Sequence, residues 1–148
     1  MTDRDSPRST VGRVLIVEDA SALGRQLGQA LEEAGLEVAT AREGLEALWR
    51  ARGTQFDLVL TDVHMPTMDG LQLLRELRKL PQYGTTPVYF LTADGSKERL
   101  ARGRELGATA WIVKPPNIPV LVQAVRSAVI SRRLAATSGG LPEAPAGS

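Results

Sequence analysis

The sequence predicts an α/β fold, with one doubly wound domain built on a parallel sheet. Short apolar runs alternate with segments of helical periodicity along the 148 residues, and this alternation is typical of βαβ units. Apolar residues make up 43% of the chain and charged residues 24%, which is ordinary for a globular domain with one core. We therefore expect five strands and five helices, (βα)5, in a single domain.

The five predicted strands are short and apolar. The second alternates enough to lie near an edge of the sheet. Pro87 opens the fourth, at a position where a missing N–H does least harm. The predicted strands are residues 14–17, 36–41, 58–60, 88–91 and 111–113.

The five predicted helices follow the strands in turn. The first carries Leu23, Leu27 and Leu31 on one face, and Gly35 is placed to end it. Asn117 is suited to cap the last helix, with Pro119 in its first turn. The predicted helices cover about residues 20–34, 43–52, 69–80, 96–106 and 117–133.

The two ends of the chain predict tails outside the domain, and the composition excludes several classes of protein. We expect residues 1–12 and 134–148 to be flexible tails around a domain at 13–133, because both ends are polar or rich in Gly and Pro. The net charge of +1 is too small to indicate electrostatic binding of nucleic acid. No apolar run approaches the ~20 residues of a membrane span. Cysteine is absent, which excludes disulfides and thiolate metal sites. We expect a cytoplasmic protein that binds no DNA and does not insert into membranes.

Four of the predicted strands run into reactive polar residues. Glu18 and Asp19 follow the first strand and Asp62 the third, while Thr92 follows the fourth and Lys114 the fifth. In a parallel sheet these endings meet at the carboxyl edge, where open α/β sheets bind ligands. Singly, such an Asp is usually a helix cap, and such a Thr or Lys has no function; together they supply complementary chemistry.

That chemistry suits a metal ion and a phosphoryl group. Neighbouring carboxylates repel one another unless a cation lies among them, and Mg²⁺ prefers oxygen ligands, often one or two carboxylates plus phosphate oxygens. Asp62 is then a candidate nucleophile, because carboxylates form aspartyl-phosphates. Lys114 and Thr92 would each cover one phosphoryl oxygen.

The chain resembles a response-regulator receiver domain over about residues 13–133. The most specific motif is Asp62-Val-His-Met-Pro-Thr-Met-Asp-Gly70; the others are Glu18-Asp19, Leu91-Thr92-Ala93 and Lys114-Pro115. The resemblance implies a flavodoxin-like sheet of order 2-1-3-4-5. It also implies a cis Lys114–Pro115 bond, whose low cost is a general property of X-Pro.

The resemblance assigns a role to each residue of the predicted site. Asp62 is the implied phospho-acceptor, and Asp19, Asp62 and the backbone carbonyl of His64 are the implied Mg²⁺ ligands. Glu18 would reach the metal through water, and Lys114 would bridge to the acylphosphate. With no second histidine in the chain, His64 is expected to be a loop residue rather than a side-chain metal ligand.

Two further positions are expected to tune the lifetime of the phosphoryl group. His64 lies two residues after the acceptor, and Asp94 lies two after Thr92. In the family these positions flank the path of the attacking water.

The resemblance places the output surface around Trp111. Family members carry Tyr or Phe there, which turns inward on activation; a bulkier Trp is expected to mute that switch or to hold one rotamer. Arg99, Arg102 and Arg104 are either a solvated face or a docking surface for an acidic partner segment. Pro116 replaces the usual Phe after Lys-Pro, and Trp49 is expected to pack partly on the surface.

The implied function is a phosphorylation-activated switch of the single-domain chemotaxis type. A histidine kinase of the CheA type would donate the phosphoryl group, and the partner would be a flagellar-motor or motility component or another signalling protein. Such a protein is not an enzyme in the usual sense, although it catalyses its own phosphorylation and dephosphorylation. A phosphate sink or relay carrier is an alternative. A flavodoxin-like carrier or phosphatase is disfavoured, because acidic Glu18 and Asp19 occupy the first strand–helix turn.

Overall fold

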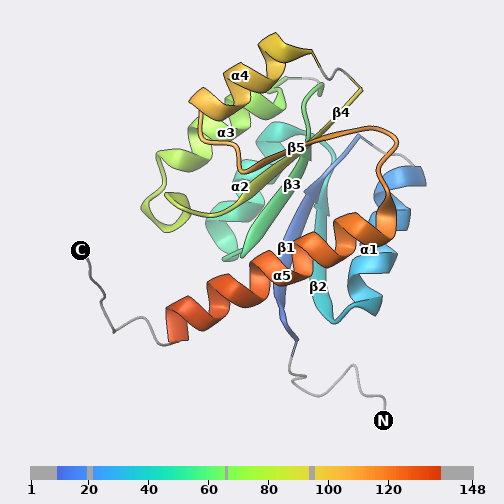
Figure 1. Cartoon of the computed structure of the whole chain (residues 1–148). Coiled ribbons are helices and arrows are strands. Elements are labelled where there is room, and N and C mark those ends of the chain that lie inside the picture. Colours follow the sequence, from blue (N-terminus) through green and yellow to red (C-terminus); the bar gives the residue numbers. More distant parts are fainter. Residues whose placement is uncertain (1–9, 20–21, 66, 94–95, 138–148) are drawn as a thin grey trace.

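Five parallel strands form one sheet in the order β2-β1-β3-β4-β5 (Figure 1). The computed structural model describes residues 10–19, 22–65, 67–93 and 96–137. The predicted fold class and strand order are both confirmed. The strands are β1 (Gly12–Val17), β2 (Leu36–Ala41), β3 (Leu58–Asp62), β4 (Val88–Thr92) and β5 (Ala110–Val113).

The central strands are buried on both faces, as expected for a parallel sheet. In β1, Leu15 and Val17 belong to one apolar cluster, whereas Val14 and Ile16 belong to a second. This division follows from the two-residue period of a strand, which sends successive side chains to opposite faces. The sheet therefore separates two cores.

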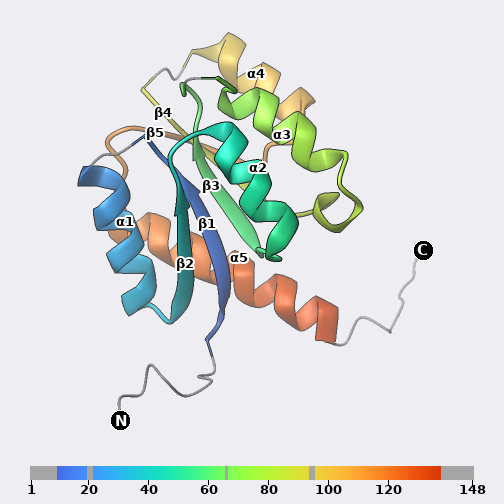
Figure 2. The same cartoon turned by 180° about the vertical axis from the view of Figure 1, so that it is seen from behind.

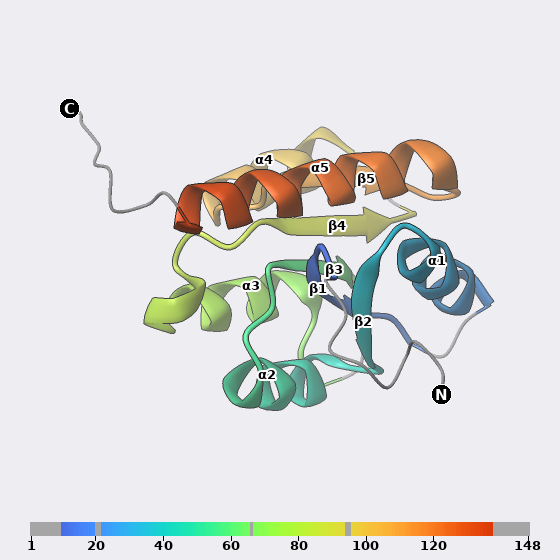
Figure 3. The same ribbon diagram turned by 90° about the horizontal axis from the view of Figure 1, so that it is seen from below.

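Helices cover both faces of the sheet. Leu27 of α1 and Val125 of α5 belong to the cluster on one face, and Ala47 of α2 and Leu73 of α3 to the cluster on the other. Figures 1 and 2 show α1 and α5 on one side and α2 and α3 behind it. Seen from below, α2 and α5 lie on opposite sides of the strands (Figure 3). The helices are α1 (Ala22–Glu33), α2 (Gly44–Gly53), α3 (Gly70–Arg78), α4 (Lys97–Glu105) and α5 (Ile118–Thr137).

Two residues that were predicted to begin or end helices do so in the structure. The Asn117 side chain accepts from the Val120 N–H at 3.1 Å, as predicted for an N-cap. Gly35 follows α1 with φ of 94°, a left-handed conformation in which an L side chain is strained. Ala20 and Ser21, where the first helix was predicted to begin, lie outside the described residues.

Regular secondary structure extends slightly past both ends of residues 13–133. Gly12 opens β1, and the N–H of Val11 donates to the Gly35 carbonyl at 2.9 Å. Helix α5 continues to Thr137, four residues beyond its predicted end at 133. At the predicted end, the Arg133 guanidinium lies 3.0 Å from the Asp57 carboxylate.

A short 3-10 helix, η2 (Pro81–Tyr83), precedes β4 and was not predicted. Its Tyr83 side chain is fully buried. The Tyr83 hydroxyl lies 2.8 Å from the Ala51 carbonyl and 2.7 Å from the Thr54 carbonyl, and it accepts from the Phe56 N–H at 3.1 Å. One buried hydroxyl thus satisfies the backbone between α2 and β3, at the edge opposite to the predicted site.

Candidate functional site at the carboxyl edge of the sheet

Four strands end side by side at the carboxyl edge of the sheet, namely β1, β3, β4 and β5. Asp62 pairs in register with Leu91, and Thr92 pairs with Val113. Backbone bonds continue past the strands, from the Glu18 N–H to the Ala41 carbonyl at 2.9 Å and from the Lys114 N–H to the Thr92 carbonyl at 2.8 Å. The backbone at Glu18 and Lys114 is therefore joined to the neighbouring strands by the same kind of hydrogen bond as the sheet.

Lys114 links two of the predicted acids. Its Nζ lies 3.0 Å from Asp62 Oδ2 and 3.6 Å from Glu18 Oε2. All three side chains are largely withdrawn from solvent, with 25% of Lys114, 13% of Asp62 and 7% of Glu18 exposed. The sheet thus brings residues separated by 96 positions (18 to 114) into one buried ionic cluster.

The charge of this cluster does not balance. One ammonium faces two carboxylates, so the three groups carry a net charge of −1 if all are ionised, in surroundings where ions are costly to bury. The donor set offers carboxylate oxygens beside the exposed Asp19, which is the chemistry that hard divalent cations select. The residues present therefore fit a divalent cation.

The remaining predicted site residues lie around this cluster. Thr92 is fully buried at the end of β4, whereas Asp19 and His64 are exposed. The Lys114–Pro115 bond is cis, as expected. Within the described part of the chain, no group of three or more acidic or histidine side chains is already arranged around a common metal position. Asp94 lies outside the described residues.

The loop after Asp62 contains two positioning residues whose purpose the motif alone does not explain. Asp69 caps α3: its Oδ1 accepts from the Gln72 N–H at 2.9 Å, and the Gln72 side chain accepts in return from the Asp69 N–H. Gly70 lies against the backbone of Asp62, where a Cβ atom would collide with the Asp62 carbonyl oxygen. The Asp-Gly pair therefore lets α3 start directly behind the predicted acceptor.

Trp111 lies inward against the core. Its indole meets the Phe90 ring edge to face, with centroids 5.2 Å apart and planes at 72°. The sequence argument missed Gly103 in α4, where a Cβ atom would stand 2.5 Å from Trp111 Cζ3. Because Gly103 has no side chain, α4 leaves room for the Trp111 indole.

The predicted arginine face is not one continuous surface. Arg104 lines a small hollow with Trp111 and Leu100. Arg102 instead lines a hollow between α3 and α4 together with Asp69 and Glu98. The Arg99 side chain lies outside the described part of the structure.

A comparison with protein families decides the identity of this arrangement. The model of the response regulator receiver domain matches residues 14–126. The chain belongs to the response regulator receiver domain family. The buried Asp62, Thr92 and Lys114 thus lie at the edge of a receiver domain of a two-component response regulator.

Solved and curated receiver-containing proteins resemble this receiver domain along most of its length. The chemotaxis response regulator CheY4 of Vibrio cholerae is 37% identical, with a TM-score of 0.75, over 80% of this chain and 99% of that one. The transcriptional regulatory protein PcoR of Escherichia coli is 38% identical over 78% of this chain and 50% of its own length. The Mn²⁺-bound response regulator Rcp1 is 25% identical, with a TM-score of 0.67, over 78% of this chain and 90% of that one.

The receiver domain spans about half the length of most curated relatives that it matches, such as PcoR. Within the described residues, no helix is long and apolar enough to cross a bilayer.

Proposed function

We propose that this receiver domain accepts a phosphoryl group on Asp62 from a histidine kinase and in response changes its binding to a partner. The contact that supports this most directly is Lys114 Nζ at 3.0 Å from Asp62 Oδ2. An ammonium at this distance is positioned to meet charge that develops on a group attached to Asp62.

The proposed transfer is an in-line displacement at phosphorus. An Asp62 carboxylate oxygen forms the new P–O bond while the P–N bond of the phosphohistidine breaks, and the histidine leaves with the electron pair and takes up a proton. Lys114 then turns from the carboxylate to a phosphoryl oxygen, and the Thr92 hydroxyl binds a second. Catalysis by this chain is therefore positioning and charge neutralisation.

We propose Mg²⁺ as the physiological cation of the site. Asp19, Asp62 and the backbone carbonyl of His64 would hold it, with Glu18 in contact through water. When bound, such an ion neutralises phosphoryl oxygens during transfer. The net negative charge of the buried cluster supports this assignment, as does the Mn²⁺-bound form of the similar Rcp1.

Chemotaxis or motility control is our proposal for the pathway. In support, the chain is 37% identical to the chemotaxis response regulator CheY4, with a TM-score of 0.75; it is also 38% identical to the transcriptional regulatory protein PcoR. The donor would be a kinase of the CheA type, and the output surface would include Trp111 and Arg102. A phosphate sink or relay carrier is the alternative, in which phosphorylation creates no surface that an effector prefers.

Phosphotransfer from a radiolabelled histidine kinase in the presence of Mg²⁺ tests the acceptor. We expect Asp62→Asn to lose labelling. Asp57→Asn is the matched control, because Asp57 is also a buried aspartate next to β3 but contacts Arg13 and Arg133 at the opposite edge. Labelling that persists in Asp62→Asn, or that disappears equally in Asp57→Asn, contradicts the assignment.

The pathway needs a separate measurement. Affinity for a candidate motor or motility component is compared with and without phosphorylation. A switch binds its effector more tightly in one form, whereas a sink gives equal or no binding in both. Trp111→Ala should abolish the difference without preventing the labelling of Asp62.

A further inference from the structure

Strand β2 forms an open edge of the sheet. It comes first in the order β2-β1-β3-β4-β5, and among the described strands it pairs with β1 alone. The Ala41 carbonyl faces β1, because it accepts from the Glu18 N–H at 2.9 Å. Backbone groups of successive strand residues point to opposite sides. The even-numbered residues of β2 therefore present their N–H and C=O groups outward, namely Leu36, Val38 and Thr40.

The devices that usually block an edge strand are largely missing from β2. The other edge strand, β5, is only four residues long, and a short length is one such device. In contrast, β2 has six residues, Leu-Glu-Val-Ala-Thr-Ala, with no proline and no lysine. Its one charged side chain, Glu37, is paired with Arg13 of β1 at 3.2 Å. The edge is therefore able to accept a further strand.

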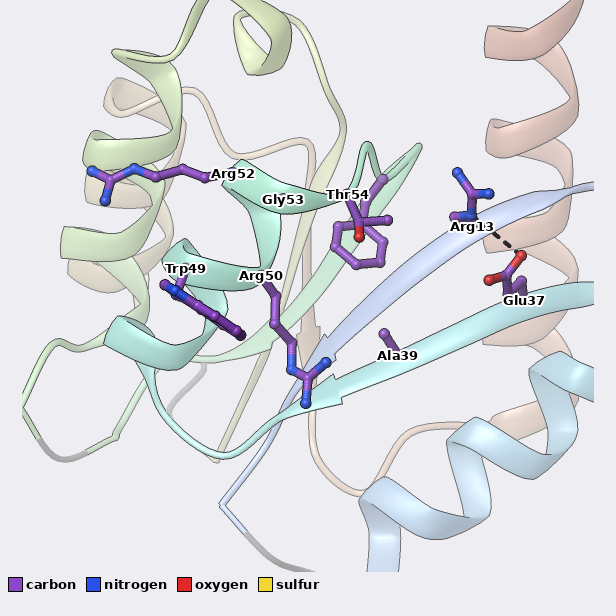
Figure 4. A pocket seen from close by; sticks show the side chains of 9 residues that line it. Arg13, Glu37, Ala39, Trp49, Arg50, Arg52, Gly53 and Thr54 are labelled. Atoms are coloured by element: carbon purple, nitrogen blue, oxygen red, sulfur yellow. Dashed lines mark hydrogen bonds and ion pairs between the residues drawn. The ribbon is translucent and has the colours of Figure 1, made fainter.

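A hollow of about 520 Å³ lies on the face of β1 and β2 that α2 covers. Glu37 and Ala39 of β2 form part of its floor, and α2 with the segment that follows it forms its wall (Figure 4). We call it the Trp49 groove. It is lined by Arg13, Glu37, Ala39, Trp49, Arg50, Arg52, Gly53, Thr54 and Phe56.

Trp49 gives this groove a large apolar surface. Its side chain is 72% exposed, and tryptophan is enriched among the residues that contribute most to binding at interfaces. A strand added beside β2 would direct every second side chain to the face of the sheet on which Trp49 lies. The indole therefore favours an added strand with an apolar side chain on that face.

The charge of the groove favours an acidic segment. Its lining carries three guanidinium groups and one carboxylate. Arg50 reaches from α2 toward β2, and Arg13 lies on the strand side (Figure 4). Each is about two-fifths exposed and has one acidic partner, Glu37 for Arg13 and Glu46 for Arg50. Since a guanidinium has five N–H donors, both arginines retain capacity for a further carboxylate.

We propose that β2 accepts an extended acidic segment of a partner protein as a sixth strand of the sheet. The segment pairs with the outward backbone groups of β2. On the α2 face, an apolar side chain lies against Trp49 and carboxylates meet Arg13 and Arg50. A second copy of this chain suits the edge less well, because antiparallel pairing of two β2 strands places two basic grooves side by side. This inference does not depend on phosphorylation of Asp62.

Solution NMR of the full isotope-labelled chain, titrated with synthetic peptides, tests the proposal. The probe is capped Glu-Thr-Leu-Val-Glu-Thr, whose alternate side chains are acidic, apolar and acidic on one face. Its counterpart carries Lys at both acidic positions. Two N-methylated versions of the probe, one for each set of alternate amides, complete the series. Only one set of amides donates to β2, so one version should bind much less well than the other.

We expect the acidic probe to shift the amide resonances of the outward residues of β2, with a Kd on the order of 0.1 mM. The fluorine resonance of 5-fluorotryptophan at residue 49, assigned with Trp49→Phe, should move in the same titration. The Lys counterpart should not bind, because it brings ammonium groups against Arg13 and Arg50. Asp62→Asn should bind the probe as wild type does.

Variants of the groove separate the apolar contribution from the ionic one. Trp49→Ala should weaken binding of the probe about tenfold, and Arg50→Gln should weaken it about two- to fivefold. Leu45→Ala is the control for the first, because Leu45 is also exposed on α2 but does not line the groove. Lys79→Gln is the control for the second, because Lys79 is also paired with a nearby glutamate, Glu76, outside the groove. Both controls should keep the Kd of wild type.

Three results would overturn the proposal. The first is an acidic probe that leaves the β2 resonances unchanged at about 2 mM, or a Lys counterpart that binds equally well. The second is equal binding by both N-methylated versions, since that result excludes pairing through the backbone. The third is a Val38 amide resonance that changes with the concentration of the free protein, because a second copy would then occupy the edge.

Discussion

Gly103 of α4 lies directly against the indole of Trp111, so closely that a Cβ atom at position 103 would stand 2.5 Å from Cζ3 and 2.7 Å from Cε3. The inward position of Trp111 and the absence of a side chain at residue 103 are therefore one structural feature. On the other side, the indole meets Phe90 of β4. Trp111 thus connects α4 with the strand that ends at Thr92.

Gly103→Ala is predicted to push Trp111 out of this position. Alanine favours a helix over glycine by about 1 kcal/mol, but the collision with an aromatic ring costs more, typically about 1–3 kcal/mol for an overpacked site. We expect a lower urea midpoint and a red-shifted Trp111 emission in a Trp49→Phe background. Gly28→Ala in α1 is the matched control: its nearest contacts would lie at 3.7 and 3.9 Å, so it should stabilise the domain. Equal effects at both positions would show that Gly103 has no special relation to Trp111.

Tyr83 is predicted to make stability fall at alkaline pH. Burial raises the pKa of its phenol above the ordinary value of 10.0, and the charge of Asp57 adds to this effect, while the hydrogen bond from the Phe56 backbone opposes it. A raised folded-state pKa means that the neutral phenol is favoured in the fold. Its contribution is therefore complete below about pH 10 and is lost as pH rises through the folded-state pKa. Urea unfolding between pH 8 and 11 should show a weaker decline in Tyr83→Phe, with a residual decline from Tyr89, whose pKa burial also raises.

The carboxyl-edge cluster was predictable because it depends on strand order. Asp62 and Lys114 end strands of a parallel sheet, so any fold with those strands in one sheet brings them to the same edge. The 3.0 Å contact between them follows from topology more than from packing detail. The same reasoning located Glu18 and Thr92.

Features that depend on which side chains fit together were not predictable in this way. Nothing in the local sequence of Gly103 relates it to Trp111, because the contact joins a helix to a strand. Trp49, which was expected to pack partly on the surface, is 72% exposed; helical periodicity places residue 49 on a face but does not set that fraction. The last turns of α5 are held by Arg133 and Asp57, a pair separated by 76 positions.

Asp57 is predicted to matter more to stability than its partner Arg133. Asp57→Ala leaves the Arg13 N–H without its acceptor and removes the ion pair, so we expect a loss of about 2–4 kcal/mol in the free energy of unfolding. Arg133 is half exposed, and Arg133→Ala should cost at most about 1 kcal/mol. A double-mutant cycle from urea unfolding measures the coupling between the two side chains. A larger loss in Arg133→Ala than in Asp57→Ala would contradict this ranking.

Asp62→Asn is predicted to stabilise the domain when divalent ions are removed. The change leaves Glu18 and Lys114 as a balanced pair, 3.6 Å apart, and removes the excess negative charge, a gain of about 1 kcal/mol. It also removes a proposed ligand of Mg²⁺. An ion that binds only the folded state stabilises wild type by about 2.7 kcal/mol at a hundredfold excess over its Kd, and Asp62→Asn should lose most of that response. Urea midpoints are compared in chelator and in Mg²⁺, with Asp57→Asn as the variant expected to keep the response to the ion. An unchanged Mg²⁺ response in Asp62→Asn would place the cation elsewhere on the molecule.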